Sequence, residues 1–190
     1  MKTVAIFLSV VLTLISVRCA FAQHQTFILD ADASKVAFAL NGSGHHVEGT
    51  FRVQSGSVDF DRAAPGIAGT VVVGAGSGNS GEPSRDKKMN SDVLNVEQYA
   101  TVTFEPKSYQ GTVAPSGDST IQLTGIFTLH GTPHDLTVPM QLHFDGANLT
   151  AKTHFTVPYV KWGLKDPSMF ILKVAKDVDI DLTLVGHVTP

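Results

Sequence analysis

DLTVPMQLHF, residues 135–144, decides the fold class, because apolar side chains occupy nearly every second position from Leu136 to Phe144. A β-strand places alternate residues on opposite faces, so this period of two predicts one dry face and one wet face. The next four residues, Asp145-Gly146-Ala147-Asn148, are a turn signal. A second alternating stretch follows, and the sequence therefore predicts a β-hairpin around residues 145–148.

The same alternation recurs along most of the chain, separated by turn signals rich in glycine and proline. Short alternating strands at this spacing predict an all-β antiparallel sandwich or barrel, with the apolar stripes on its inner face. The other stripes are Val36, Phe38 and Leu40; Phe51 and Val53; Ile121, Leu123, Phe127 and Leu129; Phe155, Val157 and Tyr159; and Val178, Ile180, Leu182 and Leu184.

One stretch has a helical pattern instead. Ser84, preceded by Pro83, is expected to cap a short helix that runs toward Val96. The glycine-rich stretch 74–81 lies before it and is expected to be a flexible loop. A dinucleotide-binding loop would open an apolar helix, whereas Pro83 and a polar segment follow this one.

The N-terminus has the pattern of a cleaved secretory signal. Lys2 supplies a positive charge, residues 4–17 are apolar apart from serine and threonine, and residues 20–22 read Ala-Phe-Ala. The apolar run is shorter than the ~20 residues that span a bilayer, so we favour cleavage over a stable membrane anchor. We expect a signal peptide over 1–22 and one periplasmic or secreted domain over 23–190.

Composition limits the chemistry of the mature chain. The single cysteine, Cys19, lies in the expected signal, so residues 23–190 can form neither a disulfide nor a thiolate metal site. The full sequence has 14 lysines and arginines against 17 aspartates and glutamates, a formal charge of −3. Cleavage of the expected signal removes Lys2 and Arg18. The mature chain then has 12 lysines and arginines against 17 aspartates and glutamates, a formal charge of −5. A mildly acidic chain without basic clusters predicts no nucleic-acid partner and no anionic membrane surface as partner.

Catalytic signatures are missing from the sequence. It contains no G-x-S-x-G, H-E-x-x-H, C-x-x-C or Walker-type motif, so we expect no enzyme activity and no cofactor. Among the eight histidines, His45, His46, His130 and His134 occur in turn-like contexts, but their spacing matches no established ligand pattern, and we expect no metal site. Asp177, Asp179 and Asp181 are expected on the solvated face of a strand.

Three groups of residues resemble the YceI-like family. The first is Ser34-Lys35-Val36-x-Phe38 with Gly49-Thr50-Phe51, and the second is Arg85-Asp86-Lys87-Lys88-Met89 followed by Tyr99-Ala100-Thr101-Val102-Thr103-Phe104. The third is Leu123-Thr124-Gly125-x-Phe127-Thr128-Leu129-His130-Gly131. Their order and spacing extend the resemblance over nearly the whole mature chain.

The resemblance implies an extended, eight-stranded antiparallel lipocalin-like barrel with one short helix. Its long apolar channel would hold a polyisoprenoid chain or a similar amphiphile, with any polar contact at the mouth. On this basis we expect channel contacts from Phe38, Phe51, Phe104, Phe127, Phe155, Trp162, Met169 and Phe170. The expected polar contacts at the mouth are His45, Arg85 and Asp86.

The function that follows is an exported carrier for an isoprenoid or similar long-chain apolar ligand. An eight-stranded barrel is just wide enough to hold one small ligand, and each buried methylene contributes ~0.8 kcal/mol without any charged contact. Two alternatives stay open. One is a periplasmic redox-associated protein that uses its histidines for a metal or haem and has a membrane cytochrome as partner. The other is a secreted barrel, filled by its own side chains, that binds a partner protein through its loops.

Overall fold

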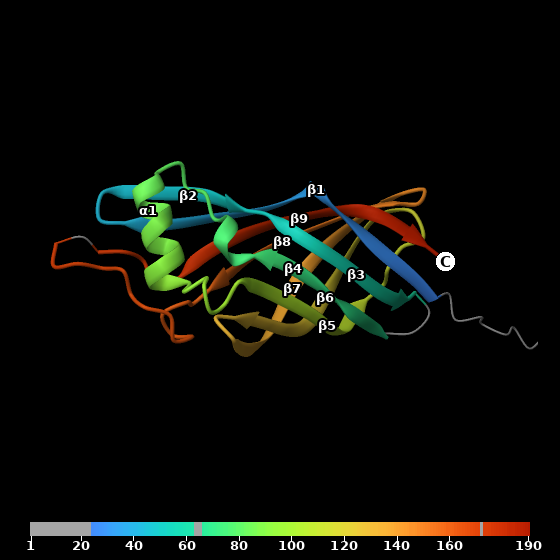
Figure 1. Cartoon of the computed structure of the whole chain (residues 1–190). Helices are drawn as coiled ribbons and strands as arrows, with labels where there is room; N and C mark the ends of the chain where they lie inside the picture. Colours follow the sequence, from blue (N-terminus) through green and yellow to red (C-terminus); the bar gives the residue numbers. More distant parts are fainter. Residues whose placement is uncertain (1–23, 63–65, 172) are drawn as a thin grey trace, which may run out of the picture.

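A computed structural model describes residues 24–62, 66–171 and 173–190, apart from the side chain of His45. The predicted signal peptide, residues 1–22, lies outside the described residues. The described part is an antiparallel barrel (Figure 1). Its strands are β1 (His24–Gly42), β2 (His45–Phe51), β3 (Val53–Asp61), β4 (Ile67–Gly74), β5 (Thr101–Gly111), β6 (Gly117–Leu129), β7 (Thr132–Asp145), β8 (Asn148–Val157) and β9 (Val178–Thr189).

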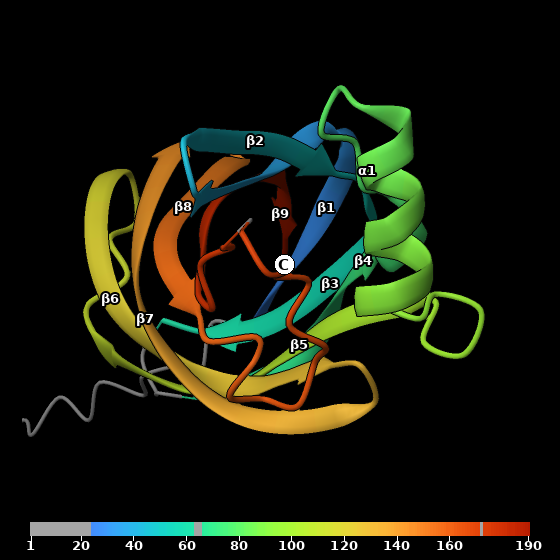
Figure 2. The ribbon, with the colours of Figure 1, turned by 90° about the vertical axis from the view of Figure 1, so that its left-hand side faces the viewer.

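The sheet closes on itself through the pairing of β1 with β9. From β3 to β9 each strand pairs with the next one along the chain. β2 and β3 share one position in the ring, because β2 pairs with the C-terminal half of β1 and β3 with its N-terminal half. Eight strand positions therefore surround the interior (Figure 2), and the predicted eight-stranded antiparallel barrel is confirmed.

The alternation that predicted the fold is also confirmed. In β7, Val138, Met140, Leu142 and Phe144 are buried, whereas the residues between them are exposed. The predicted hairpin joins β7 to β8, because Asp145 pairs with Asn148. Gly146, between them, has a φ of 59°, which a glycine adopts without steric cost at the first central position of a two-residue turn.

The predicted helix exists but begins and ends elsewhere. Helix α1 is Pro83–Lys88, and a π-helical turn, η2 (Met89–Val93), continues it. The N-cap is Glu82 rather than Ser84, because Pro83 occupies the first helical position, which suits its fixed φ and missing N–H. The Glu82 carboxylate accepts hydrogen bonds from the Ser84 backbone N–H and hydroxyl, at 3.2 and 2.9 Å.

The glycine-rich stretch 74–81 has a more regular structure than the predicted flexible loop. It contains a 3₁₀ turn, η1 (Ala75–Ser77). Beyond it, the backbones of Asn79 and Thr50 exchange two hydrogen bonds of 2.9 Å. The stretch thereby pairs with β2, the strand that lacks a second neighbour in the ring.

The segment that joins β8 to β9, residues 158–177, contains no helix or strand in its described part (158–171 and 173–177) and lies across one end of the barrel. Figure 2 looks along the barrel at this end and shows the orange-red segment crossing the opening beside α1. The interior beneath it is apolar along the length of the barrel. In the described part of the chain no helix is both long and apolar enough to cross a membrane.

Candidate functional site: an apolar channel with a polar mouth

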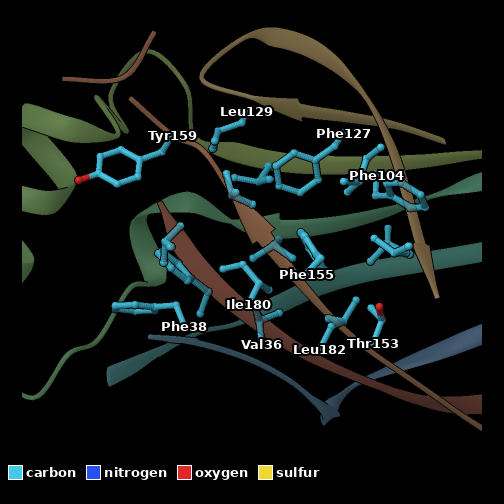
Figure 3. A pocket seen from close by; sticks show the side chains of 18 of the residues that line it. Val36, Phe38, Phe104, Phe127, Leu129, Thr153, Phe155, Tyr159, Ile180 and Leu182 are labelled. Atoms are coloured by element: carbon cyan, nitrogen blue, oxygen red, sulfur yellow. The ribbon is translucent and has the colours of Figure 1, made fainter. Parts of the chain in front are cut away.

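A cavity of about 740 Å³ occupies the interior of the barrel. Its walls are the inward faces of the strands, and the apolar stripes seen in the sequence supply most of its surface. Figure 3 shows side chains from different strands turned toward the same space. The labelled ones are Val36, Phe38, Phe104, Phe127, Leu129, Thr153, Phe155, Tyr159, Ile180 and Leu182.

The five phenylalanines expected in the channel all line the cavity. They are Phe38, Phe51, Phe104, Phe127 and Phe155. Phe38 and Phe51 pack with ring centroids 5.2 Å apart, and Phe127 meets Phe155 edge to face at 6.1 Å. Such pairs present large apolar surfaces with few rotamers to freeze, which suits a wall against a flexible chain. Their contact with a ligand stays a prediction.

The three other expected channel residues lie in different places, all in segment 158–177. Met169 lines the cavity near its open end. Trp162 does not line the cavity, because its ring stacks on that of His134 with centroids 4.0 Å apart. Phe170 is fully exposed and lies away from the cavity wall. Trp162 and Phe170 do not line the cavity because the period of two ends with β8, so alternation no longer fixes where side chains point, and their contact with a ligand stays a prediction.

Among the described residues, charged side chains line the cavity only at the end covered by α1, η2 and segment 158–177, which is therefore its mouth. Arg85, expected there, lines it and donates hydrogen bonds to the hydroxyl and carbonyl of Ser80, at 2.8 and 2.9 Å. Lys165 and Asp92 also line it and approach to 3.8 Å, which joins segment 158–177 to η2. No motif in the sequence indicated Lys165 or Asp92 as mouth residues.

Two other residues expected at the mouth make no described contact with the cavity. Asp86 does not line it, because its carboxylate points toward Ser80 and accepts hydrogen bonds from the Ser80 backbone N–H, at 2.9 Å, and hydroxyl. It thus fixes the turn before α1. The backbone of His45 begins β2, and its side chain lies outside the described part of the structure.

Both carboxylates on the mouth rim favour the ionised form. The hydrogen bond from Ser91 and the nearby Lys165 ammonium lower the pKa of Asp92. Hydrogen bonds from Ser168 lower the pKa of Asp166, and Lys176, 4.0 Å away, adds to this effect. The rim thus offers charges of both signs above an apolar interior.

The opposite end of the cavity is walled by buried apolar side chains. Phe27, Phe60 and Phe144 are each less than one tenth exposed. The Arg62 guanidinium lies over the Phe144 ring, 4.6 Å from its centroid, which is the geometry of a cation–π contact. Among the described residues that line the cavity, the charged side chains therefore lie at one end only.

Tyr159 ties segment 158–177 together just inside the mouth. Its ring lines the cavity, and its hydroxyl donates a hydrogen bond of 2.7 Å to the carbonyl of Ala175. Burial raises the pKa of Tyr159 to about 12, with smaller contributions from the negative charges of Asp166 and Asp177. The sequence predicted Tyr159 as the end of a strand stripe, but β8 ends at Val157.

Thr153 is a polar residue inside the channel that no sequence motif indicated. It is 8% exposed and lines the cavity, and its hydroxyl has no hydrogen-bond partner within the described structure. The signal was available, because Thr153 has the parity of Phe155 and Val157 in the same strand. A hydroxyl in such a place lowers the stability of the empty barrel unless something binds it.

The histidines form no described metal centre. No group of three or more histidine, cysteine, aspartate and glutamate side chains comes together in the described ranges. His130 lies against the ring of Tyr99, with centroids 4.1 Å apart, and His134 lies against Trp162. Asp181 is exposed and accepts from His154, 3.0 Å away, so it lies on the solvated outer face as expected.

The residues that form this barrel match a known domain. A family profile described as the YceI-like domain covers residues 27–186, which is most of the chain. The chain belongs to the YceI-like family. The resemblance inferred from the sequence motifs is therefore confirmed.

Curated relatives of this YceI-like domain include proteins called UPF0312. The UPF0312 protein of Pseudomonas fluorescens (strain SBW25) is 29% identical over 151 residues, which cover 74% of this chain and 73% of that protein. The UPF0312 protein of Pseudomonas syringae pv. tomato is 25% identical over 176 residues, which cover 87% and 88%.

Solved structures show the same fold at lower identity. BcnA of Burkholderia cenocepacia has a TM-score of 0.69 and 23% identity, over 84% of this chain and 99% of that one. A polyisoprenoid binding domain from Saccharophagus degradans, described as implicated in plant cell wall breakdown, has a TM-score of 0.64 and 17% identity, over 86% and 98%. These likenesses support the barrel architecture of this YceI-like domain.

Proposed function

We propose that this YceI-like domain is an exported carrier that holds one isoprenoid or similar long-chain apolar molecule inside its barrel. The observation that carries the proposal is the apolar cavity of about 740 Å³ with a polar mouth at one end. This volume lies within the roughly 300–1,000 Å³ that small-molecule sites occupy. A barrel filled by its own side chains would leave no such space, so the cavity favours a carrier over that alternative.

The energetics of the channel suit a long apolar chain. Each buried methylene contributes ~0.8 kcal/mol, so a five-carbon isoprenoid unit contributes about 4 kcal/mol before the entropy of ordering it is subtracted. The phenylalanine pairs form fixed surfaces for such a chain. The likeness to a polyisoprenoid binding domain also supports this ligand class.

The mouth gives the ligand a direction. Arg85, Lys88, Asp92 and Lys165 line the cavity at this end, whereas the opposite end is walled by buried apolar residues. A charged head group deep in the channel would lose its hydration without a charged partner, which is costly. The apolar tail therefore enters first and any polar head remains at the rim.

We expect this barrel to bind its ligand without chemical conversion. The cavity lining has serine, threonine and tyrosine hydroxyls, but no histidine among the described residues to activate them. Nucleophilic catalysis by a hydroxyl needs an adjacent general base. The predicted partnership with a membrane cytochrome stays a prediction.

Native mass spectrometry of the mature protein, before and after organic extraction, tests the carrier function. We expect the untreated protein to carry an extra mass that extraction removes and that a fluorescent isoprenoid restores. Protein that carries no extractable mass and takes up no fluorescent isoprenoid would contradict the proposal.

A matched pair of variants locates the ligand in the barrel. Ala151 is buried and lines the cavity, so Ala151→Phe fills part of the space with an apolar ring and should lower isoprenoid uptake at least tenfold. Ala37 belongs to β1 but does not line the cavity, so Ala37→Phe adds the same ring outside it and should leave uptake unchanged. Equal uptake by the two variants would place the ligand elsewhere.

Export is the second part of the proposal and is supported by the sequence of residues 1–22 alone. The intact mass of protein collected from periplasm or medium tests it. We expect a chain that begins at Gln23, and retention of Met1 in exported protein would contradict cleavage.

A further inference from the structure

Three consecutive apolar side chains project into solvent beside the mouth. Met169 is 60% exposed, Phe170 102% and Ile171 87%, and we call these three residues the apolar tip. Figure 1 shows segment 158–177, in orange and red, extending beyond α1 and the β1–β2 hairpin at the mouth end of the barrel. Contiguous exposed apolar residues usually mark a surface that binds a protein, a membrane or a ligand.

The apolar tip stands on a fixed base. On one side Asp166 accepts a hydrogen bond of 2.9 Å from the Ser168 backbone N–H, and the Ser168 hydroxyl accepts one of 3.0 Å from Val174. On the other side Lys173 and Ser43 are joined by two hydrogen bonds of 2.7 and 3.1 Å. The Ser168–Val174 bond joins the two flanks of the tip to each other, and the Lys173–Ser43 bonds attach the second flank to the hairpin between β1 and β2, so the exposure of the tip follows from a held conformation.

Basic residues accompany the apolar tip. Segment 158–177 has four lysines against two aspartates, whereas the remainder of residues 23–190 has eight lysines and arginines against 15 aspartates and glutamates. All four lysines are exposed. Lys161 and Lys173 make no ion pair within the described structure. The positive charge that the net composition conceals is therefore concentrated in segment 158–177, which carries the tip.

We propose that the apolar tip docks the barrel mouth onto an anionic phospholipid bilayer. Phe170 and Ile171 would enter the boundary between head groups and acyl chains, and Lys161 and Lys173 would meet the lipid phosphates. This combination of exposed apolar side chains with exposed lysines in one segment is the chemistry that such a boundary favours. The prediction from net charge that no anionic membrane surface is a partner is thereby revised for this end of the molecule.

Docking at this point places the mouth against the bilayer. Met169 and Val174, which flank the exposed pair, line the cavity. An apolar ligand that leaves the bilayer at the tip therefore meets the apolar wall of the cavity at once. The inference goes beyond the proposed carrier function, because the surface would bind lipid whether or not the barrel is loaded.

A protein partner fits the surface less well. Three side chains of at most about 250 Å² each fall short of the roughly 800 Å² that each partner buries in a standard protein interface. A bilayer needs no matching shape and accepts a small insertion supported by charge.

Vesicle flotation with the mature full-length chain tests the inference. One set of vesicles is phosphatidylcholine alone, and the other contains roughly one third phosphatidylglycerol to supply negative charge. We expect binding to the anionic set and at least tenfold weaker binding after Phe170→Asp. The matched control is Ile28→Asp on β1, the other large apolar residue exposed in the described part, which should bind as the unchanged chain does.

The contribution of charge is tested with two double variants. Lys161→Glu with Lys173→Glu should weaken binding to the anionic vesicles by at least about tenfold, since each surface lysine contributes about fivefold. Lys35→Glu with Lys152→Glu makes the same change in net charge on the barrel wall, where both lysines are exposed, and should have little effect. Equal losses in the two double variants would overturn the role of the tip lysines.

Loading from detergent separates this inference from the carrier function. Phe170 does not line the cavity, so Phe170→Asp should take up a fluorescent isoprenoid from micelles as the unchanged chain does. Vesicle binding by Phe170→Asp at the level of the unchanged chain would overturn the docking inference and leave the carrier function standing. A third outcome is that the unchanged chain binds no vesicles but forms a dimer, and that Phe170→Asp does not form this dimer. That result would overturn the docking inference and assign the apolar tip to contact with a second copy of the chain.

Discussion

The rings of His134 and Trp162 lie almost parallel, with centroids 4.0 Å apart and an interplanar angle of 7°. His134 belongs to β7 and Trp162 to segment 158–177, so the stack attaches that segment to the barrel. The Trp162 ring also lies 5.8 Å from the ring of Phe127, which lines the cavity. The mouth segment is thus linked through two aromatic contacts to the channel wall.

Removal of this stack should loosen the mouth segment. We expect His134→Ala to lower the free energy of unfolding by roughly 0.5–1.5 kcal/mol, the range for an aromatic pair. Trp162 is the only tryptophan in the sequence, so its fluorescence reports on the site directly. Emission should shift to the red and become more accessible to a soluble quencher in His134→Ala. His154→Ala, an exposed histidine on β8, is the control, and an equal response in both variants would contradict the role of the stack.

Tyr159 gives the mouth segment a dependence on alkaline pH. Burial raises the pKa of Tyr159 from 10.0 to about 12 in the folded chain, so the unfolded chain releases this proton first. Tyr159 therefore contributes its full stability below about pH 10, and that contribution falls as the pH rises toward 12. Urea unfolding at several alkaline pH values should show this decline, and Tyr159→Phe should make it shallower.

A second tyrosine provides the control for that titration. Burial also raises the pKa of Tyr109, helped by the charge of Asp61, and its hydroxyl donates to the Asp61 carbonyl at 2.6 Å. Tyr109→Phe should remove a smaller part of the alkaline decline than Tyr159→Phe. The reverse order would contradict the assignment of the larger shift to Tyr159.

The strands and the channel wall were predictable because a period of two leaves little freedom. Once one face of a strand is buried, every second residue must face the core, and a slip of one residue would expose the whole apolar set. This is why all five expected phenylalanines line the cavity. Thr153 obeys the same rule, but a threonine in an alternating pattern is readily assigned to the wet face.

The mouth was less predictable because neither of its elements has that constraint. In a short helix each residue turns the side chain by about 100°, so Arg85 lines the cavity while its neighbour Asp86 does not. Segment 158–177 has no regular period, and there Phe170 points into solvent and Trp162 onto His134. The apolar character of Phe170 and Trp162 predicted that each contacts an apolar surface, but it did not determine which surface that is.

Gly125 should be intolerant of any side chain. It interrupts the stripe of β6 and pairs with Pro106 of β5, next to an irregularity in the ladder. A Cβ at this position would collide with the Glu105 carbonyl oxygen and lie 2.6 Å from the Phe104 ring. Because one obstacle is backbone, we expect Gly125→Ala to lower the free energy of unfolding by about 1–3 kcal/mol.

The control for Gly125 is a glycine with room around it. Among the described residues, a Cβ at Gly66 would meet nothing within 4 Å, and the φ of Gly66 lies outside the positive region. Gly66→Ala should therefore leave the urea midpoint within experimental error or raise it slightly. Equal destabilisation by the two substitutions would contradict the steric explanation.

The unpartnered hydroxyl of Thr153 predicts a substitution that stabilises the empty barrel. Valine has the same branched shape, so Thr153→Val keeps the packing and removes a buried polar group that has no described partner. We expect urea unfolding of the extracted protein to show a gain of about 1 kcal/mol. Thr156→Val in the same strand is the matched control, because the Thr156 hydroxyl donates to Asp179 at 2.7 Å and its loss should lower stability by about 0.5–1.5 kcal/mol. A loss of stability in Thr153→Val as large as in Thr156→Val would mean that the channel hydroxyl is already bound in the empty barrel.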